Sequence, residues 1–311
     1  MNNGSTDTDL QDLDSKLRTI LPEEYQECYE DLKPLSMGSA GLKFDASGRV
    51  AWDEIWKTFC DLAMAGGPPH RGTLLEPGKL PEIESQPEQY QTVVEEICRG
   101  IRMVSGLTVH QSPNPGWVHL TCTDTGMATW MARAITMENI SAHAENSVVS
   151  LPAGPHFRLE KEIKNVVTSV AKTAHYFVDH IGPAQQRAIA ELFEKAEATA
   201  PLLQPGIPNE LHNESTIRAL RDHVDQELRR KTGLPSSGPE YLGWLGLKCI
   251  SLRSAIWLMR ALVVNSVLAR REGNVLFVPI DPALDPTGDR VVRAVLEARS
   301  LALRKGIVVD A

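Results

Sequence analysis

Residues 116–152 read GWVHLTCTDTGMATWMARAITMENISAHAENSVVSLP, and residues 243–279 read GWLGLKCISLRSAIWLMRALVVNSVLARREGNVLFVP. A shift of 127 residues aligns the two stretches without a gap, and a glycine, two tryptophans, a cysteine, an arginine, a glutamate and a proline recur in register. Solenoid repeats have periods of roughly 20–50 residues. The longer period therefore predicts a duplicated unit of domain size.

The residues around these stretches extend the repeat in both directions. Residues 89–104 and 216–231 are both predicted to be helical, and each is followed by a Ser/Thr-Gly-Leu turn. A strand, a long apolar helix, a short β-rich strand and a last helix then follow in both copies, which predicts one αβαβα unit per copy. Two such units commonly pack about a pseudo-two-fold axis, as the two chains of a homodimer do. We therefore expect an α/β protein whose two copies form a pseudo-two-fold body, with a helical N-terminal segment.

Four parts are expected along the chain. They are an N-terminal segment of helices, a hairpin and a Pro-rich loop over residues 1–87, the first α/β repeat over 88–182, a connecting helix and loop over 183–214, and the second α/β repeat over 215–311. The sequence leaves open whether the strands join in one sheet or two. It also leaves open whether residues 66–86 form a plain linker or a loop over a site.

Composition and charge narrow the function classes. Of the 311 residues, 42% are hydrophobic and 23% are charged, and the net charge is -8, which makes a nucleic-acid partner unexpected. No apolar run is long enough to span a bilayer, so no membrane partner is expected either. The five cysteines include no Cys-x-x-Cys pair and the N-terminus has no apolar signal segment. These features favour a cytoplasmic protein, and they leave open whether it is a homo-oligomer.

The differences between the two copies indicate where a site would be. The first copy carries polar or titratable side chains at several positions where the second carries mostly small, apolar or neutral ones. These exchanges, first copy to second, are His119 to Gly246, Thr123 to Ile250, Asp124 to Ser251, Thr125 to Leu252, Glu138 to Asn265, Asn139 to Ser266 and His143 to Arg270. A duplicated protein of this kind commonly has one working site and one copy retained for packing. We therefore expect the functional site in the first repeat.

The reactive end of that site is expected where the strand WVHLTC meets the next helix. Cys122 ends the strand, and Asp124 or Thr125 is a natural N-cap. Because the N–H groups of a helix N-terminus stabilise a thiolate, we expect a lowered pKa for Cys122, with His119 as a nearby base or co-ligand. Cys122, His119, Asp124 and Thr125 are thus the candidate catalytic residues. The alternative is a buried, inert cysteine beside an ordinary helix cap.

A second group of residues would bind an anionic substrate. His156, Arg158 and Lys161 lie near the start of the last helix of the first repeat, where a carboxylate or phosphate would be stabilised. The alternative for this stretch is a solvated charged helix.

Further binding candidates come from two other segments. Asn139 and His143 are four residues apart and are expected to share a helix face, and His70 and Arg71 belong to the Pro-rich loop. The alternative for that loop is a plain connector. His119, Cys122 and His143 are also metal-ligating residue types, but their spacing matches no zinc pattern, so no metal site is predicted.

No dinucleotide-binding, P-loop, nucleophile-elbow or metalloprotease signature occurs in the sequence, and the cofactor is therefore unknown. Our leading hypothesis is a cytoplasmic enzyme of small-molecule or cofactor metabolism, thiol-dependent and acting on an anionic small molecule, with its active site in the first repeat. The alternative is a non-catalytic accessory or assembly protein that binds a partner protein. The substrate and the reaction class stay open.

Overall fold

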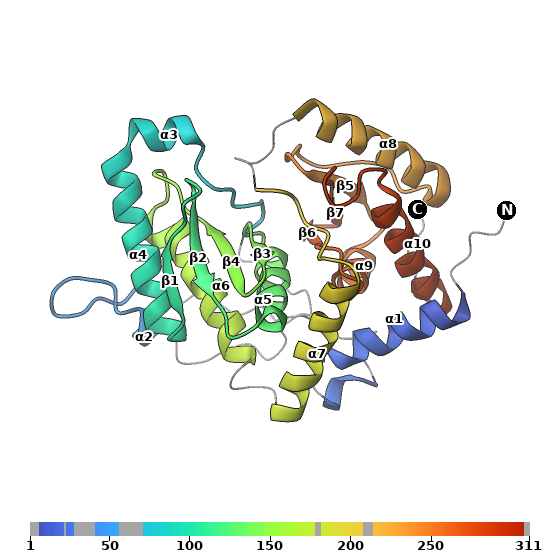
Figure 1. The fold of residues 1–311 in the computed structure, drawn as a ribbon, viewed down its shortest axis with the longest axis horizontal. Helices are drawn as coiled ribbons and strands as arrows, with labels where there is room; N and C mark the ends of the chain where they lie inside the picture. Colours follow the sequence, from blue (N-terminus) through green and yellow to red (C-terminus); the bar gives the residue numbers. More distant parts are fainter. Residues whose placement is uncertain are drawn as a thin grey trace. The chain divides into compact units, whose positions relative to one another are not determined.

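The structure is a computed structural model of a mixed α/β protein, and it describes residues 6–21, 23–27, 41–55, 71–177, 182–207 and 214–307. The chain divides into two compact units (Figure 1). Unit 1 comprises Met1–Lys33, Met64–Gly66 and Glu191–Ala311, and unit 2 comprises Pro34–Ala63 and Gly67–Ala190. Each unit contains one small sheet.

The sheet of unit 2 has four antiparallel strands in the order β1-β2-β4-β3. Their bounds are β1 Thr108–Gln111, β2 Trp117–Thr121, β3 His143–Glu145 and β4 Val148–Pro152. Each half of the predicted αβαβα unit therefore contains a pair of strands where one was expected. The reason is that the two edge strands, β1 and β3, are only four and three residues long and show little apolar alternation.

Helices cover one face of this sheet. They are α4 Pro87–Ser105, α5 Thr125–Met137 and α6 Lys164–His175, the last preceded by a π-helical turn, η3 Leu159–Ile163. The shorter helices of unit 2 are α2 Trp52–Ile55 and α3 Leu80–Ser85. Val109, Leu120 and Val149 are opposite one another on neighbouring strands and are almost fully buried, so this row marks the core face of the sheet.

Unit 1 has a three-stranded antiparallel sheet in the order β5-β7-β6. Its strands are β5 Trp244–Lys248, β6 Arg270–Glu272 and β7 Val275–Pro279. Its helices are α1 Asp7–Thr19, a short 3-10 turn η1 Glu23–Tyr25, α8 Glu214–Thr232, α9 Leu252–Val264 and α10 Asp289–Arg304. The chain passes from unit 2 to unit 1 within α7, Pro183–Thr199. The predicted N-terminal helix is α1, which begins with a Thr6 capping box and contacts α9 and α10.

The strand pairings of the two sheets correspond residue by residue. Trp117 pairs with Pro152 in unit 2, and Trp244 pairs with Pro279 in unit 1, and the pairings continue in step along both strand pairs. The glycine before each of these tryptophans has a positive φ, 89° for Gly116 and 77° for its counterpart in unit 1. A residue with a side chain would be strained there. The strand order β2-β4-β3 of unit 2 thus corresponds to the order β5-β7-β6 of unit 1, and unit 2 has β1 as an additional edge strand.

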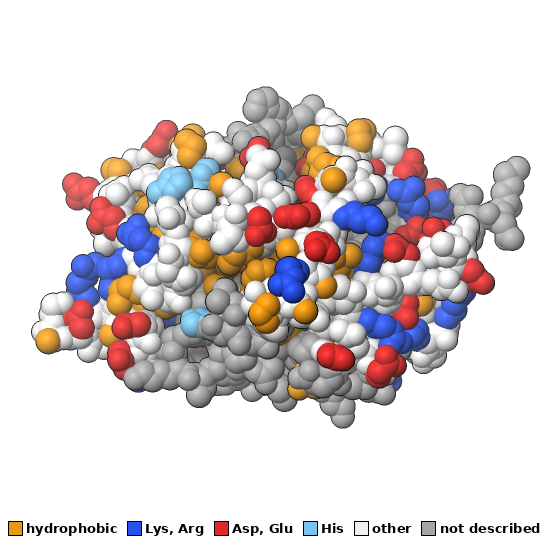
Figure 2. Space-filling model, turned by 60° about the horizontal axis from the view of Figure 1, so that its bottom comes forward, with side chains coloured by type: hydrophobic (Ala, Val, Ile, Leu, Met, Phe, Trp, Pro, Cys, Tyr) orange, Lys and Arg blue, Asp and Glu red, His pale blue; other side chains and the backbone are white. Residues whose placement is uncertain are grey.

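Helix hydropathy and surface charge complete the description. No helix in the described part of the chain is long and apolar enough to cross a membrane. On the face drawn in Figure 2, acidic and basic side chains are interspersed, and neither sign covers a continuous area.

Candidate functional site

A row of polar side chains crosses the sheet of unit 2. His110 on β1 pairs with His119 on β2, His119 pairs with Ser150 on β4, and Ser150 pairs with His143 on β3. Directly paired residues of an antiparallel sheet point to the same face. These four residues, which we call the histidine row, therefore lie together on the face opposite to the core row that contains Leu120.

Most of the histidine row is accessible. His110 is exposed, His119 and His143 are partly exposed, and Ser150 is 4% exposed. The rings of His110 and His119 meet edge to face, with centroids 5.7 Å apart and an interplanar angle of 79°. The row thus offers several imidazole groups to one ligand.

The turn between β1 and β2 fixes the ring of His119. Nε2 of His119 lies 2.7 Å from Oγ of Ser112, and the same Oγ accepts the backbone N–H of Asn114 at 3.0 Å. Ser112 itself is held by its own N–H, which donates to the carbonyl oxygen of Trp117 at 3.1 Å. A serine hydroxyl can donate or accept, so this contact fixes the position of the ring in either tautomer, and Nδ1 is the ring nitrogen outside it.

The charge of His119 is set by its surroundings. Burial lowers the pKa of His119 below its usual value, and a positive charge on His110 lowers it further, whereas the carboxylate of Glu145 acts in the opposite direction. His119 therefore carries a neutral imidazole at neutral pH. A neutral imidazole has a lone pair for a proton or a metal ion.

The corresponding positions of unit 1 are closed. Gly246 pairs with Phe277, and Phe277 pairs with Arg270, which is 0% exposed. The guanidinium carbon of Arg270 lies 4.0 Å from the ring centroid of Phe277, 4.5 Å from that of Tyr241 and 5.0 Å from that of Trp244. The cation fills this face of the sheet by stacking on aromatic rings.

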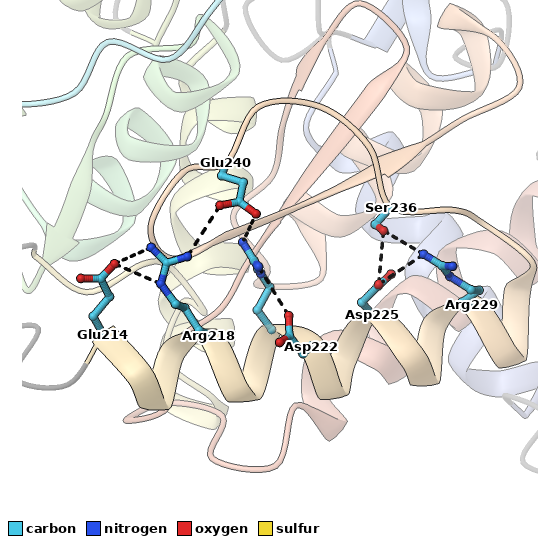
Figure 3. Close-up of polar contacts among 8 residues, drawn as sticks. Glu214, Arg218, Asp222, Asp225, Arg229, Ser236 and Glu240 are labelled. Carbon is cyan, nitrogen blue, oxygen red and sulfur yellow. Dashed lines mark hydrogen bonds and ion pairs between the residues drawn. The ribbon is translucent and has the colours of Figure 1, made fainter.

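Ion pairs hold a loop beside this closed face. Glu240 contacts Arg218 at 3.6 Å and Arg221 at 3.3 Å, and Ser236 donates to Asp225 at 3.2 Å, as Figure 3 shows for α8 and the loop that follows it. The loop passes so close to β5 that a Cβ at position 246 would overlap a backbone oxygen. Unit 2 therefore contains the more accessible of the two equivalent positions.

The structure does not provide the lowered pKa expected for Cys122. Its side chain is 6% exposed, its Sγ–H donates to Sδ of Met131 at 3.7 Å, and burial, assisted by the charge of Asp124, raises its pKa to about 12. Burial also raises the pKa of Cys249 to about 12. The thiol follows β2 on the core side, beneath α5, instead of facing the open helix N-terminus. It also lies on the opposite side of the strand from His119.

Asp124 and Thr125 occupy the helix start as predicted. Asp124 is the N-cap of α5 and accepts the backbone N–H of Met127 at 2.7 Å, and Thr123 donates to the same carboxylate at 2.8 Å. Thr125 is the first residue of the helix. Ser251 caps α9 of unit 1 in the same way. This is the capping interpretation, which requires no ligand.

The structure brings together three of the predicted binding residues, but around a carboxylate. Nδ2 of Asn139 donates to the carbonyl oxygen of Arg71 at 2.9 Å, and Nη1 of Arg71 lies 3.3 Å from Oε1 of Glu162. Arg158 donates to Glu162 through its backbone N–H at 3.0 Å and through its guanidinium at 3.3 Å. These contacts lower the pKa of Glu162 to about 2 despite its burial. Both guanidinium groups are thus already paired with an anion of the chain itself.

The other predicted binding residues lie elsewhere. Nδ1 of His156 is 3.8 Å from Glu82 of α3, and Lys161 is exposed on η3. His70 lies outside the described residues. Asn139 and His143 do not share a helix face, because α5 ends at Met137 and Asn139 turns the chain with a φ of 59°. His143 belongs to β3 instead.

Sequence reasoning missed several residues that the structure places at these sites. Within the histidine row and its support they are His110, Ser112 and Ser150, and in the core they are Glu162 and Lys172, which forms an ion pair with Glu138. The available signal was the pair of histidines on either side of a turn that contains Pro and Gly. Such a pair becomes informative only if residues 108–111 are recognised as a strand.

Two further findings bear on the function of these residues. Within the described residues, no group of three or more His, Cys, Asp or Glu side chains is arranged to hold a metal ion. No family model, no curated protein and no solved structure matches the chain. The assignment of a function therefore rests on the geometry of the chain itself.

Proposed function

We propose that the protein is a non-catalytic binding protein whose ligand surface is the histidine row of unit 2. The observation that carries this proposal is the contrast between equivalent positions. The row is accessible at His110, His119 and His143, whereas the corresponding face of unit 1 is filled by Arg270 and its aromatic neighbours. Because one face of an antiparallel sheet is commonly polar and solvated, it is the contrast between the two units, and not the polarity of the row alone, that supports a ligand site.

The same contrast supports an origin of the two units by duplication, with unit 1 retained as a structural counterpart. The turns after α4 and α8 support this origin. Ser105 Oγ accepts the backbone N–H of Leu107, and Thr232 Oγ1 accepts that of Leu234, both at 3.2 Å. Such side-chain caps are not required by the fold class, so their recurrence at the same spacing favours common descent.

The proposed ligand is an anionic small molecule. Imidazole N–H groups and the hydroxyl of Ser150 can donate to carboxylate or phosphate oxygens, and a protonated imidazole adds a positive charge. Glu145 lies on the same face, two residues from His143 on β3. Its negative charge disfavours a polyanion, so a ligand with a single acidic group fits best.

The cysteines are in keeping with a cytoplasmic protein. The sequence has no Cys-x-x-Cys pair, and Cys98, Cys122 and Cys249 are free thiols.

A binding measurement tests this proposal. A panel of monocarboxylates and phosphate monoesters is screened by thermal shift at about pH 6 and about pH 8, and the best ligand is titrated calorimetrically. We expect His143→Gln and Ser150→Ala to weaken binding by about tenfold each, the value of one hydrogen bond. His156→Gln is the matched control, because His156 is an exposed histidine of unit 2 outside the row. Equal affinities for the wild type and His143→Gln would contradict the proposal, as would a panel without any ligand.

One observation favours a second candidate, a hydrolase. The contact of 2.7 Å between Ser112 Oγ and His119 Nε2 has the geometry of a nucleophile and its general base. In this alternative Ser112 Oγ attacks the carbonyl carbon of an ester while His119 Nε2 takes the hydroxyl proton; the ester bond then breaks, the alcohol leaves with that proton, and water hydrolyses the acyl-serine. A fluorophosphonate probe distinguishes the two candidates. Labelling of Ser112 that is lost in His119→Gln would support the hydrolase, and an unlabelled Ser112 would eliminate it.

A further inference from the structure

His110 and His119 form a directly opposed pair of histidines on two antiparallel strands. They are the first two members of the histidine row, on β1 and β2, and their ring centroids are 5.7 Å apart. We propose that these two side chains bind one divalent transition-metal ion of the zinc, nickel or copper type. This metal site goes beyond the binding of an organic anion and does not depend on it.

The distance between the rings suits a shared ion. A zinc–nitrogen bond is about 2.0–2.1 Å, which places the centroid of a coordinating imidazole about 3.2 Å from the metal. Two such rings at a tetrahedral angle have centroids about 5.2 Å apart by the same geometry. The observed 5.7 Å for His110 and His119 differs from this value by about half an ångström. A small rotation of the exposed His110 side chain closes the difference.

The surroundings of His119 resemble those of a metal ligand. Metal-binding histidines usually donate their second ring N–H to an oxygen, which fixes the tautomer and the orientation of the ring. Nε2 of His119 lies 2.7 Å from Ser112 Oγ, an oxygen that is itself held by the N–H of Asn114. In the tautomer that donates Nε2–H to Ser112 Oγ, the lone pair of His119 is on Nδ1 and is available to the metal. Only the neutral imidazole coordinates a metal, so the ion would compete with protons for this nitrogen.

The remaining coordination positions would be taken by water or by a ligand. Among the described residues no third His, Cys, Asp or Glu completes a metal site, so the ion would have two protein ligands and open positions. Imidazole nitrogens favour zinc, nickel and copper over magnesium and calcium. Unit 1 provides an internal control, because Ser237 and Gly246 stand where unit 2 has the two histidines.

Calorimetric titration of the full chain with zinc chloride and with nickel chloride tests the proposal. We expect one ion per chain, with His110→Gln and Ser112→Ala each weakening the affinity by at least about tenfold. His156→Gln and His223→Gln, both at exposed positions, are expected to bind as the wild type does. Because His110 is exposed at a sheet edge, its substitution leaves the core intact, and circular dichroism checks the fold of each variant.

Two further readouts make the outcome unambiguous. Zinc should shift the imidazole ¹⁵N resonances of His119 while those of His156 stay unchanged, and binding should weaken below about pH 6 because protons compete for the ring. No heat of binding with either metal, or a His110→Gln variant with wild-type affinity, would overturn the proposal. His143→Gln separates this site from the organic-anion site. That variant should retain the metal and lose affinity for the anion.

Discussion

The reactivity of the two equivalent cysteines can be predicted quantitatively. Burial raises the pKa of Cys122 and of Cys249 to about 12. At about pH 8, a thiol with this pKa is about one ten-thousandth thiolate, whereas a free cysteine with a pKa near 8.5 is about one quarter thiolate. Since the thiolate is the species that reacts, alkylation of both residues should be slower than that of a free thiol by about three orders of magnitude. Cys98, whose pKa burial raises to about 11, should also be slow.

Iodoacetamide labelling of the native protein, followed by peptide mass spectrometry between about pH 6 and about pH 9, measures these rates. Full labelling after unfolding in guanidinium is the control that each thiol is chemically intact. The expected result is that Cys122 and Cys249 react at similar, very low rates. If Cys122 reacted far ahead of its counterpart, with a midpoint below about 8.5, the reasoning from burial would be refuted and the thiol-dependent enzyme would regain its basis.

Three further predictions concern stability. The pKa of Glu162 is lowered to about 2 in the folded protein. Its contribution to stability is therefore present above about pH 4.3 and is lost as the pH falls towards 2. In urea unfolding followed by circular dichroism, Glu162→Gln should make the free energy of unfolding depend less on pH in this acidic range. Gly246→Ala should lower the free energy of unfolding by about 1–3 kcal/mol, because the added methyl group overlaps a backbone oxygen of Ser237, and an unchanged denaturation midpoint would contradict this close approach. Asp124→Ala should lower the free energy of unfolding by about 1 kcal/mol, because the hydrogen bond that caps α5 at Met127 is lost. The labelling of Cys122 should stay slow in this variant. Faster labelling would show that Asp124 also controls access to the thiol.

The elements with a strong apolar pattern were predictable. The predicted helix 89–104 lies within α4, Pro87–Ser105, and the strand that begins at Trp117 is β2. Both have a buried face with a clear periodicity, and both end at residues with recognisable conformational preferences, such as Gly106 with its φ of 69°. In such segments the local pattern and the packing agree.

The prediction failed where one residue changes the direction of the chain. Asn139 and Ser266 both have a positive φ, 59° and 57°, and each follows the end of an apolar helix. Residues other than glycine rarely adopt this conformation, so a propensity argument continues the helix past them. The strands β3 and β6 that follow were missed for this reason. His143 was consequently assigned to a helix instead of a sheet edge.

The candidate site was only partly predictable because strand pairing assembles it. His119 and His143 were singled out by comparing the two copies, but His110 and Ser150 join them only through the order β1-β2-β4-β3. A sequence shows which residues alternate along a strand, and it does not show which strands are neighbours. The pseudo-two-fold arrangement and the oligomeric state stay predictions.

The accessibility of the histidine row depends on several residues that differ between unit 2 and unit 1, and not on His143 alone. In unit 1, the buried Arg270 stacks on Tyr241, Trp244 and Phe277. At the same spacing unit 2 has Asn114, Trp117 and Ser150, so two of the three aromatic rings are missing. Arg270 is also paired with Glu272 at 2.7 Å, and Glu145 could supply that ion pair to an arginine at position 143, but most of the aromatic stacking that helps to offset the cost of burying the cation would be missing. The closed arrangement of unit 1 could not be rebuilt in unit 2 by His143→Arg alone, and at least three coupled exchanges separate the filled face from the accessible one. The proposal of a ligand surface in unit 2 therefore rests on several residues together, and substituting His143 alone would not test it fully.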